Sequence, residues 1–403
     1  MTERRERLLA LDVFRGATVA AMLLVNDPGS WSAIYPPLAH AAWNGWTPTD
    51  LIFPFFVFIV GITTQLSLAA RRARGDDGRA IRRQILRRAA LIFLFGFLVN
   101  GFPFFTWGTV DGVADPSFWQ RFVDRLHHWR ILGVLQRIGL AYLVSALIAT
   151  RVRLRTQVAV TAVILVGYWM VMTVFPVPGS DGTLGYLLLD KPEATMAAYW
   201  DRVFLDWTRF GLGNHVWVGS RTWDPEGILS TSGAIGTALL GNIAGWWLGR
   251  ERALPERVNG LFAAGALAMM IGLMWHWVFP INKSLWTSSY AVFTAGLACV
   301  SIGTIMWMVD IQGWRRWTKP FVIYGLNPMV AFVGSGVLAR VIYSLVKVTY
   351  NGEQIPLQAA IYRSLFASWL APVNASLAFA MAYVLLFFGI LTLLYRRNIV
   401  FKV

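Results

Sequence analysis

Apolar stretches about as long as a membrane-spanning helix recur along nearly the whole chain. A helix needs about 20 mostly apolar residues to cross a bilayer. Ten stretches meet this requirement, near residues 8–26, 49–70, 85–101, 131–150, 156–175, 227–248, 258–279, 285–309, 319–347 and 375–395. A shorter apolar piece at 360–372 is interrupted by Arg363 and Pro372, so we expect a re-entrant or interfacial segment there. The pattern predicts an all-α polytopic membrane helix bundle of about 10 transmembrane helices, or 11 with that segment.

Basic residues gather in every second connection between these stretches. About 23 of the 36 Lys and Arg residues lie at the N-terminus, in the tail from Arg396 and in the loops 71–88, 151–155, 249–257 and 310–319. The first of these loops alone holds eight Arg. Cytoplasmic connections of membrane proteins are enriched in Lys and Arg. The distribution therefore predicts that both termini are cytoplasmic and that the number of spans is even.

The composition agrees with lipid around much of the chain. Of the 403 residues, 56% are hydrophobic and 14% are charged, and the mean hydropathy is +0.53. Soluble domains carry about 25% charged residues, so an ordinary cytosolic enzyme, a disordered chain and a secreted scaffold are all excluded. The net charge of +15 then reports topology, and no nucleic-acid partner is expected. A single cysteine, Cys299, leaves no disulfide framework and no thiolate metal site.

Apolar stretches run from one end of the sequence to the other, so residues 1–403 are predicted to form a single transmembrane domain. The longest external connection, at about 176–226, is rich in Pro, Gly, Asp and Trp and is expected to form an ordered cap. Gly241, Gly245 and Gly249 recur every four residues and predict close helix packing. Packing inside one subunit is the favoured interpretation, and a homodimer seam is the alternative.

Several polar residues fall inside the predicted spans, where an ionisable side chain costs about 2.5–3.5 kcal/mol by insertion scales. Asp12 and Arg15 are three residues apart on the first span, a spacing that suits a structural ion pair. The alternative is that Arg15 meets a phosphate from the cytoplasmic side. Gln136 and Arg137 lie in the fourth span, and Asn327 precedes a proline that interrupts the ninth. Together these residues place more polar side chains inside the spans than we expect in a helix bundle with only a structural role.

A second polar group lies at the external ends of the first two spans. It contains Asn26, His40, Asn44 and Asp50, and Lys283 occupies the external turn between the seventh and eighth spans. Histidine gains and loses a proton near neutrality and suits acid–base or nucleophilic work, although an isolated histidine often has a structural role. Capping of the second span would explain Asp50 equally well. No histidine pair has metal-ligand spacing, so no metal is expected.

Nine short blocks combine these polar residues with aromatic and glycine positions. They are 11–16 (LDVFRG), 25–26 (VN), 40–45 (HAAWNG), 50–54 (DLIFP), 56–61 (FVFIVG), 130–137 (RILGVLQR), 224–229 (DPEGIL), 280–286 (PINKSLW) and 325–328 (GLNP). In content and order, across nearly the whole chain, they resemble the heparan-alpha-glucosaminide N-acetyltransferase family of transmembrane acetyltransferases.

The resemblance implies an enzyme that takes an acetyl group from cytoplasmic acetyl-CoA and delivers it to an amine on the external side, typically terminal glucosamine or another amino sugar. The family's histidine in the H-A-x-W-N-G block is regarded as catalytic and corresponds to His40. Compared with the lysosomal members, we expect this chain to be a core-only bacterial relative in the inner membrane, without their additional N-terminal luminal segment and first helix. Acetyl-CoA, an amino-sugar or glycan acceptor and the lipid bilayer are the partners expected.

Acyl transfer needs a base for the amine and donors for the developing oxyanion. His40 is the predicted base, with Asp50 orienting the imidazole and Asn26 or Asn44 donating to the oxyanion. In the alternative route His40 is acetylated first and then attacked by the amine.

Acetyl-CoA is the predicted co-substrate, and its phosphates require basic residues on the cytoplasmic half. The residues predicted to bind it or to line the reaction chamber are Arg15, Arg88 with the rest of the 82–88 cluster, Gln136, Arg137, Lys283 and Asn327. A different class of function stays open, in which a solute transporter or flippase uses the same polar pathway.

Overall fold

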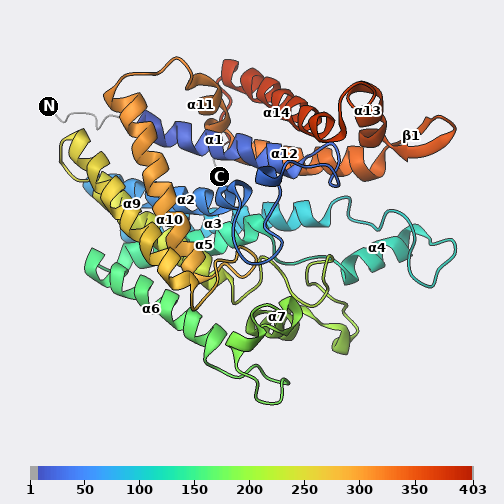
Figure 1. Ribbon diagram of the computed structural model, residues 1–403, viewed down its shortest axis with the longest axis horizontal. Coiled ribbons are helices and arrows are strands. Elements are labelled where there is room, and N and C mark those ends of the chain that lie inside the picture. Colours follow the sequence, from blue (N-terminus) through green and yellow to red (C-terminus); the bar gives the residue numbers. More distant parts are fainter. Residues whose placement is uncertain (1–7, 402–403) are drawn as a thin grey trace.

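Helices make up most of residues 8–401, the part of the chain that this computed structural model describes (Figure 1). The α-helices are α1 (Leu9–Asn26), α2 (Ile52–Ala73), α3 (Gly78–Gly101), α4 (Phe118–His127), α5 (Val134–Arg151), α6 (Leu154–Thr173), α7 (Met196–Leu205), α8 (Thr231–Leu248), α9 (Leu254–His276), α10 (Ser288–Met306), α11 (Lys319–Leu326), α12 (Pro328–Arg340), α13 (Leu357–Leu365) and α14 (Pro372–Arg396). Strands β1 (Lys347–Tyr350) and β2 (Glu353–Pro356) form one antiparallel hairpin. The prediction of an all-α helix bundle is confirmed.

Nine helical segments of the described chain are long and apolar enough to cross a membrane, as expected for an integral membrane protein. They are Leu9–Asn26, Pro48–Ala73, Gly78–Gly101, Val134–Arg151, Leu154–Thr173, Leu254–His276, Ser288–Ile311, Pro328–Leu345 and Pro372–Arg396. The sixth predicted span corresponds to α8, which is 18 residues long but is not among the nine. Because α8 packs against α2, α5, α6 and α10, protein covers most of its surface and it needs less apolar character.

The contact between α2 and α8 depends on glycine. A Cβ atom at Gly61 would stand 2.1 Å from the backbone oxygen of Ala238, and one at Gly241 would stand 2.2 Å from that of Phe58. At Gly245 a Cβ atom would meet the backbone oxygen of Ile62 at 2.8 Å. The predicted packing inside one subunit is therefore confirmed for Gly241 and Gly245, and a dimer seam stays a prediction.

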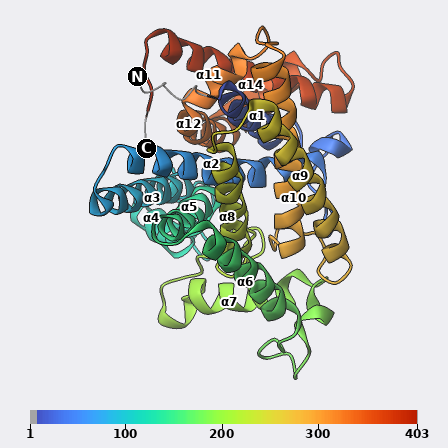
Figure 2. The same cartoon turned by 90° about the vertical axis from the view of Figure 1, so that its left-hand side faces the viewer.

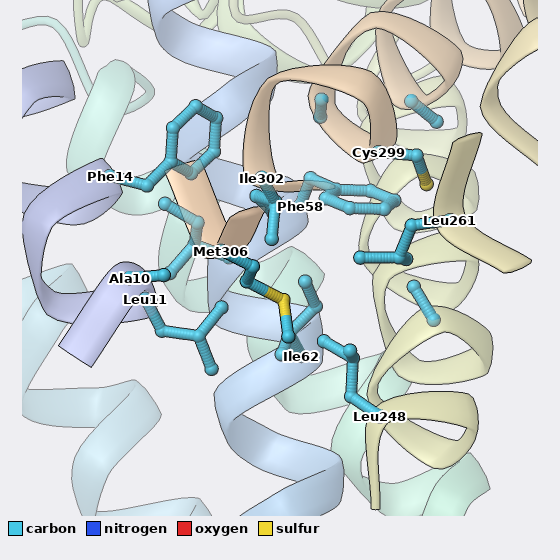
Figure 3. Packing of buried hydrophobic residues seen from close by; sticks show 14 of the residues in the cluster. Ala10, Leu11, Phe14, Phe58, Ile62, Leu248, Leu261, Cys299, Ile302 and Met306 are labelled. Carbon is cyan, nitrogen blue, oxygen red and sulfur yellow. The ribbon is translucent and has the colours of Figure 1, made fainter. Parts of the chain in front are cut away.

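Apolar side chains fill the space between the helices in several clusters. One cluster joins α1, α2, α8, α9 and α10, and Figure 3 shows its labelled members Ala10, Leu11, Phe14, Phe58, Ile62, Leu248, Leu261, Cys299, Ile302 and Met306. Viewed from the side, α1, α11, α12 and α14 lie together, α3, α5 and α6 lie opposite, and α2 and α8 run between the two groups (Figure 2).

The ninth predicted span is broken. The helix α11 ends at Leu326 and α12 begins at Pro328, because proline has no N–H to continue the hydrogen-bond ladder. The side chain of Asn327 at the break accepts a hydrogen bond from Phe401 N at 2.9 Å and donates to Ile399 O at 3.0 Å. The break thus separates α12 from α11, and Asn327 at the break holds the C-terminal segment.

The connections at the end of the bundle away from the start of α1 carry small elements of their own. The predicted cap at 176–226 contains α7, and the first part of the apolar piece at 360–372 falls on the nine-residue α13, which is too short to span a bilayer. The helices α4 and α13 and the β-hairpin lie at this end (right-hand side of Figure 1).

Candidate functional site

The connection between α1 and α2 carries His40, and local hydrogen bonds hold it in place. Thr47 caps a 3₁₀ turn, Pro48–Leu51, that leads into α2, and its hydroxyl also donates to Ala39 O at 2.7 Å. The carboxylate of Asp50 completes the cap by accepting from Thr47 N at 3.0 Å. The residue before His40 is therefore tied directly to the start of α2.

Asp50 also contacts the imidazole. Its Oδ1 lies 2.7 Å from Nδ1 of His40, while Oδ2 accepts from Ala41 N at 3.0 Å. The Asp50 side chain is 1% exposed and that of His40 is 41% exposed. A carboxylate favours the tautomer in which Nδ1–H donates to it, which leaves the Nε2 lone pair as the available base. Helix capping and orientation of the imidazole were alternative interpretations of Asp50. One carboxylate does both, because Oδ2 caps the turn before α2 and Oδ1 contacts Nδ1 of His40.

Lys283 approaches the same imidazole from the connection between α9 and α10. Its Nζ lies 3.0 Å from Nδ1 and 3.1 Å from Nε2 of His40, and 3.7 Å from Oδ1 of Asp50. Burial lowers the pKa of Lys283, and the carboxylates of Asp50 and Glu226 oppose that effect. The imidazole of His40, which can act as a base, and the ammonium of Lys283 are thus in direct contact beside the carboxylate of Asp50.

A cavity of about 140 Å³, which we call the first cavity, extends from this point into the bundle. Its polar lining residues are Thr18, Asn26, His40, Thr49, Glu226 and Lys283. The remaining wall is apolar and comes from α1, α2, α5 and the first turn of α12, with Phe56 and Met329 as examples. The first cavity is therefore narrow and apolar inside, with ionisable groups at one end.

Glu226 in this lining lies outside the residues predicted for the site. Its carboxylate accepts from the guanidinium of Arg130, whose Nε also donates to Asp224 at 2.8 Å. Although burial opposes it, the cations of Arg130 and Arg137 lower the pKa of Glu226, so Glu226 is ionised at neutral pH. A glutamate in block 224–229, directly before a predicted span, was the signal that could have indicated it.

Two amides predicted for the site, Asn26 and Asn44, have different surroundings. Asn26 lines the first cavity at the end of α1. Asn44 lies in the His40 connection, accepts from Asn282 Nδ2 at 3.1 Å and donates to Asp190 at 2.5 Å. Asn44 therefore links the His40 connection to the cap and to the α9–α10 turn.

The remaining predicted residues are more dispersed. Arg15 pairs with Asp12 at 2.8 Å, and it lies three residues before Thr18, the inner end of the first cavity on α1. Arg88 lies on α3 with its guanidinium 5.2 Å from the ring centre of Tyr142. Neither lines the first cavity.

Three polar residues predicted for the chamber have protein partners. Gln136 donates to Ile131 O at 3.1 Å, and Arg137 is buried on α5 with its guanidinium 5.2 Å from the ring centre of Trp286. Asn327 holds the C-terminal segment as described above. Within residues 8–401, no group of three or more His, Cys, Asp or Glu side chains is placed to hold a metal ion.

Comparisons with known proteins match the site region and most of the chain. A family model described as "Heparan-alpha-glucosaminide N-acetyltransferase, catalytic" matches residues 7–199, which include His40 and Asp50. The heparan-alpha-glucosaminide N-acetyltransferase of Mus musculus is 30% identical over 379 residues, which are 82% of this chain and 54% of that protein. The Homo sapiens protein of the same name is 29% identical over 373 residues, 81% of this chain and 52% of that protein.

The chain thus spans about half the length of the curated relatives that it matches. The matched region carries the blocks on which the sequence resemblance rests, and the helical bundle has the apolar spans of a membrane protein. The chain therefore belongs to the heparan-alpha-glucosaminide N-acetyltransferase family.

Proposed function

We propose that this chain transfers the acetyl group of acetyl-CoA to an amine, with terminal glucosamine or another amino sugar as the acceptor class. The names of its relatives support an N-acetyltransferase. One observation carries the proposal: an imidazole oriented by a buried carboxylate at 2.7 Å stands at the polar end of the narrow first cavity. Such a cavity suits the uncharged arm and thioester of acetyl-CoA, with the thioester toward His40.

In the direct route, Nε2 of His40 removes a proton from the acceptor ammonium or amine as nitrogen attacks the thioester carbonyl. A C–N bond forms, the C–S bond breaks, and the CoA thiolate takes a proton as it leaves. In the relay route, Nε2 attacks the carbonyl itself, and the amine then displaces His40 from the acetyl group. Asp50 supports both routes because it stabilises the positive charge that develops on the imidazole.

Both routes create an oxyanion on the acetyl carbonyl. The ammonium of Lys283, 3.1 Å from Nε2 of His40, is the cation best placed to stabilise that charge. The side chain of Asn26 lines the same cavity and is a second donor. Asn44, which is engaged with Asn282 and Asp190, acts by holding the His40 connection rather than by donating to the oxyanion.

The nucleotide end of CoA lies, in this proposal, toward the basic connections, which are cytoplasmic in a bacterial inner membrane with both termini inside. Arg15 supports this direction because it lies one helical turn beyond Thr18, the inner end of the first cavity. Arg88 and the other arginines of the 71–88 loop supply further positive charge on that side. The acetyl group then emerges at His40 on the opposite side, where the acceptor binds.

The test is acetyl transfer by the purified full chain in detergent, measured as CoA release and as N-acetylglucosamine formed. We expect His40→Ala to lower turnover at least about a hundredfold, the low end for lost acid–base assistance. His127→Ala, at the end of α4 and outside both the cavity lining and the His40 contacts, is the matched control and is expected to keep the wild-type rate.

Wild-type turnover in His40→Ala would contradict the role of His40 as the base or nucleophile. Solute uptake into liposomes that persists without acetyl-CoA and in His40→Ala would favour the transporter. Acid quenching during turnover with labelled acetyl-CoA separates the two routes, because only the relay leaves label on the protein.

A further inference from the structure

A second cavity of about 270 Å³ lies between α1, α3, α5 and α12, at the same end of the bundle as His40. It adjoins the first cavity, and the residues that line both are Met22, Asn26, Val134, Leu135 and Phe332. The charged residues in its lining are Asp27, Arg130 and Arg340. None of these three takes part in the chemistry described above.

Asp27 is the least expected of these side chains. It is 5% exposed, and within residues 8–401 its carboxyl group makes no hydrogen bond or ion pair, although it acts electrostatically on the nearby hydroxyls of Tyr343 and Tyr383. Burial alone raises the pKa of Asp27 to about 7. An unpartnered buried carboxylate is costly unless a cation meets it. Its position in a cavity wall means that a ligand can supply that cation.

Arg340 is positively charged and, like Asp27, has no ion-pair partner among the described residues. Its Nη1 donates to Gly336 O at 2.9 Å, one turn earlier on α12, and the charged residue that acts on it is another cation, Arg125. In the described part of the chain no carboxylate forms an ion pair with it. Arg130, by contrast, is neutralised by Asp224 and Glu226. The second cavity therefore offers one carboxyl group and one guanidinium that have no ion-pair partner within the described residues, and an ammonium bound at Asp27 would favour the ionised carboxylate.

We propose that the second cavity is the acceptor compartment, and that Asp27 and Arg340 together recognise an amino sugar carrying both an ammonium and an anionic substituent, a phosphate or a sulfate. This inference rests on the proposed acetyl transfer. Asn26, next to Asp27 in sequence and in the wall shared by both cavities, lies where an amine held at Asp27 would pass toward His40.

The experiment measures direct binding to the wild-type full chain in detergent by titration calorimetry, without acetyl-CoA. The probes are glucosamine, glucosamine 6-phosphate, glucosamine 6-sulfate and N-acetylglucosamine 6-sulfate. A charge-assisted hydrogen bond changes affinity by about tenfold or more. We expect the 6-phosphate or the 6-sulfate of glucosamine to bind at least about tenfold more tightly than glucosamine, and the stronger of the two identifies the anion. Loss of the positive amine in N-acetylglucosamine 6-sulfate should weaken binding by a similar factor.

Two variants assign the charges. Asp27→Asn should remove the preference for the free amine, and Arg340→Gln should remove the preference for the anionic substituent. The matched controls Asp111→Asn and Arg363→Gln change exposed residues of the same types and should bind like the wild type. Equal affinity of the wild type for all four probes, or unchanged preferences in Asp27→Asn and Arg340→Gln, would overturn the inference.

Because binding is measured without acetyl-CoA, the two proposals fail separately. A wild-type chain that binds the charged amino sugars but releases no CoA contradicts the acetyl transfer and leaves the compartment supported. A chain that acetylates glucosamine but shows no dependence on either charge contradicts the compartment alone.

Discussion

The Nζ atom of Lys283 lies 3.1 Å from Nε2 of His40, although 243 residues separate the two in sequence. The contact joins the α9–α10 turn to the connection between α1 and α2, and Asn282 reinforces it by donating to Asn44 Oδ1 at 3.1 Å. An ammonium is thereby held beside the nitrogen at which acyl transfer is proposed to occur. Nothing in either local sequence specifies this pairing.

Replacing Lys283 should affect turnover more than binding. Loss of one oxyanion donor costs about 10²–10³ in kcat, so we expect Lys283→Gln to lower kcat in that range with little change in KM for acetyl-CoA. Lys347→Gln, on the exposed edge of the hairpin, is the control. Because burial lowers the pKa of Lys283, wild-type kcat should decline on the alkaline side at a pH below the usual lysine value of about 10.4. An unchanged kcat in Lys283→Gln would contradict the role.

Asp50→Asn should separate orientation of the imidazole from capping. The amide keeps an acceptor for the backbone but loses the charge that faces Nδ1 of His40, so kcat should fall about a hundredfold or more. Thr47→Val removes the hydrogen bonds that the Thr47 hydroxyl donates to Ala39 O and to the Asp50 carboxylate, but leaves the carboxylate itself, and should cost about 1 kcal/mol of stability with kcat within a few-fold of wild type. Steady-state kinetics and thermal unfolding of both variants test this. An equal loss of kcat in the two would mean that Asp50 acts through the fold of the connection.

Arg15→Ala tests the direction in which CoA lies. If Arg15 meets a phosphate, acetyl-CoA affinity should fall about tenfold or more, since charge-assisted hydrogen bonds to phosphate are strong. The affinity is measured by titration calorimetry with acetyl-CoA and with the phosphate-free fragment acetyl-pantetheine, which should bind both chains alike. Unchanged acetyl-CoA affinity would contradict the contact with phosphate and favour a structural role for Arg15 through its ion pair with Asp12.

Asp27 should make stability depend on pH. Its pKa is raised from 3.8 to about 7 in the folded chain, so the stability contributed by the protonated carboxyl is complete below about pH 4 and is lost as the pH rises through 7. Between pH 5 and pH 8 the loss has an upper bound of about 3 kcal/mol. Thermal unfolding at the two pH values should show a smaller decrease in Asp27→Asn than in the wild type. The same decrease in both would show that Asp27 does not titrate in this window.

The α2–α8 contact should tolerate no side chain at Gly61. A Cβ atom there would stand 2.1 Å from Ala238 O, so Gly61→Val should destabilise the chain by at least about 2 kcal/mol through overpacking. Gly389→Ala on α14, where a Cβ atom meets nothing within 4 Å, is the matched control. It should leave stability unchanged or raise it by up to about 1 kcal/mol. Thermal unfolding in detergent measures both, and equal stability would contradict the packing described.

Much of the architecture follows from local sequence. The helices α1, α9 and α14 begin and end within a few residues of the predicted spans, because the length of an apolar run is a local property. The break in the ninth span was visible in Asn327 and its following proline. The small helix α4 and the hairpin of β1 and β2 were not predicted, because neither carries a long apolar run.

The candidate site was predictable in part. His40 and Asp50 stand ten residues apart, and capping signals around Asp50 suggested a defined turn. Glu226 and the second cavity were not predicted, because their importance depends on neighbours from other helices. Asn327 was expected in the reaction chamber, and only the structure placed its side chain against Ile399 and Phe401.

The sequence alone determined that this chain is a membrane-embedded helix bundle of the acetyltransferase type, because hydropathy, basic loops and short motifs are carried by neighbouring residues. Tertiary structure decided which polar groups share a cavity: Lys283 with His40, Glu226 with Arg130, Asp27 with Arg340. The physical reason is that contacts between distant helices depend on close backbone packing, as at Gly61 and Gly241. That packing depends on the shapes of both partners at once, which no single stretch of sequence contains.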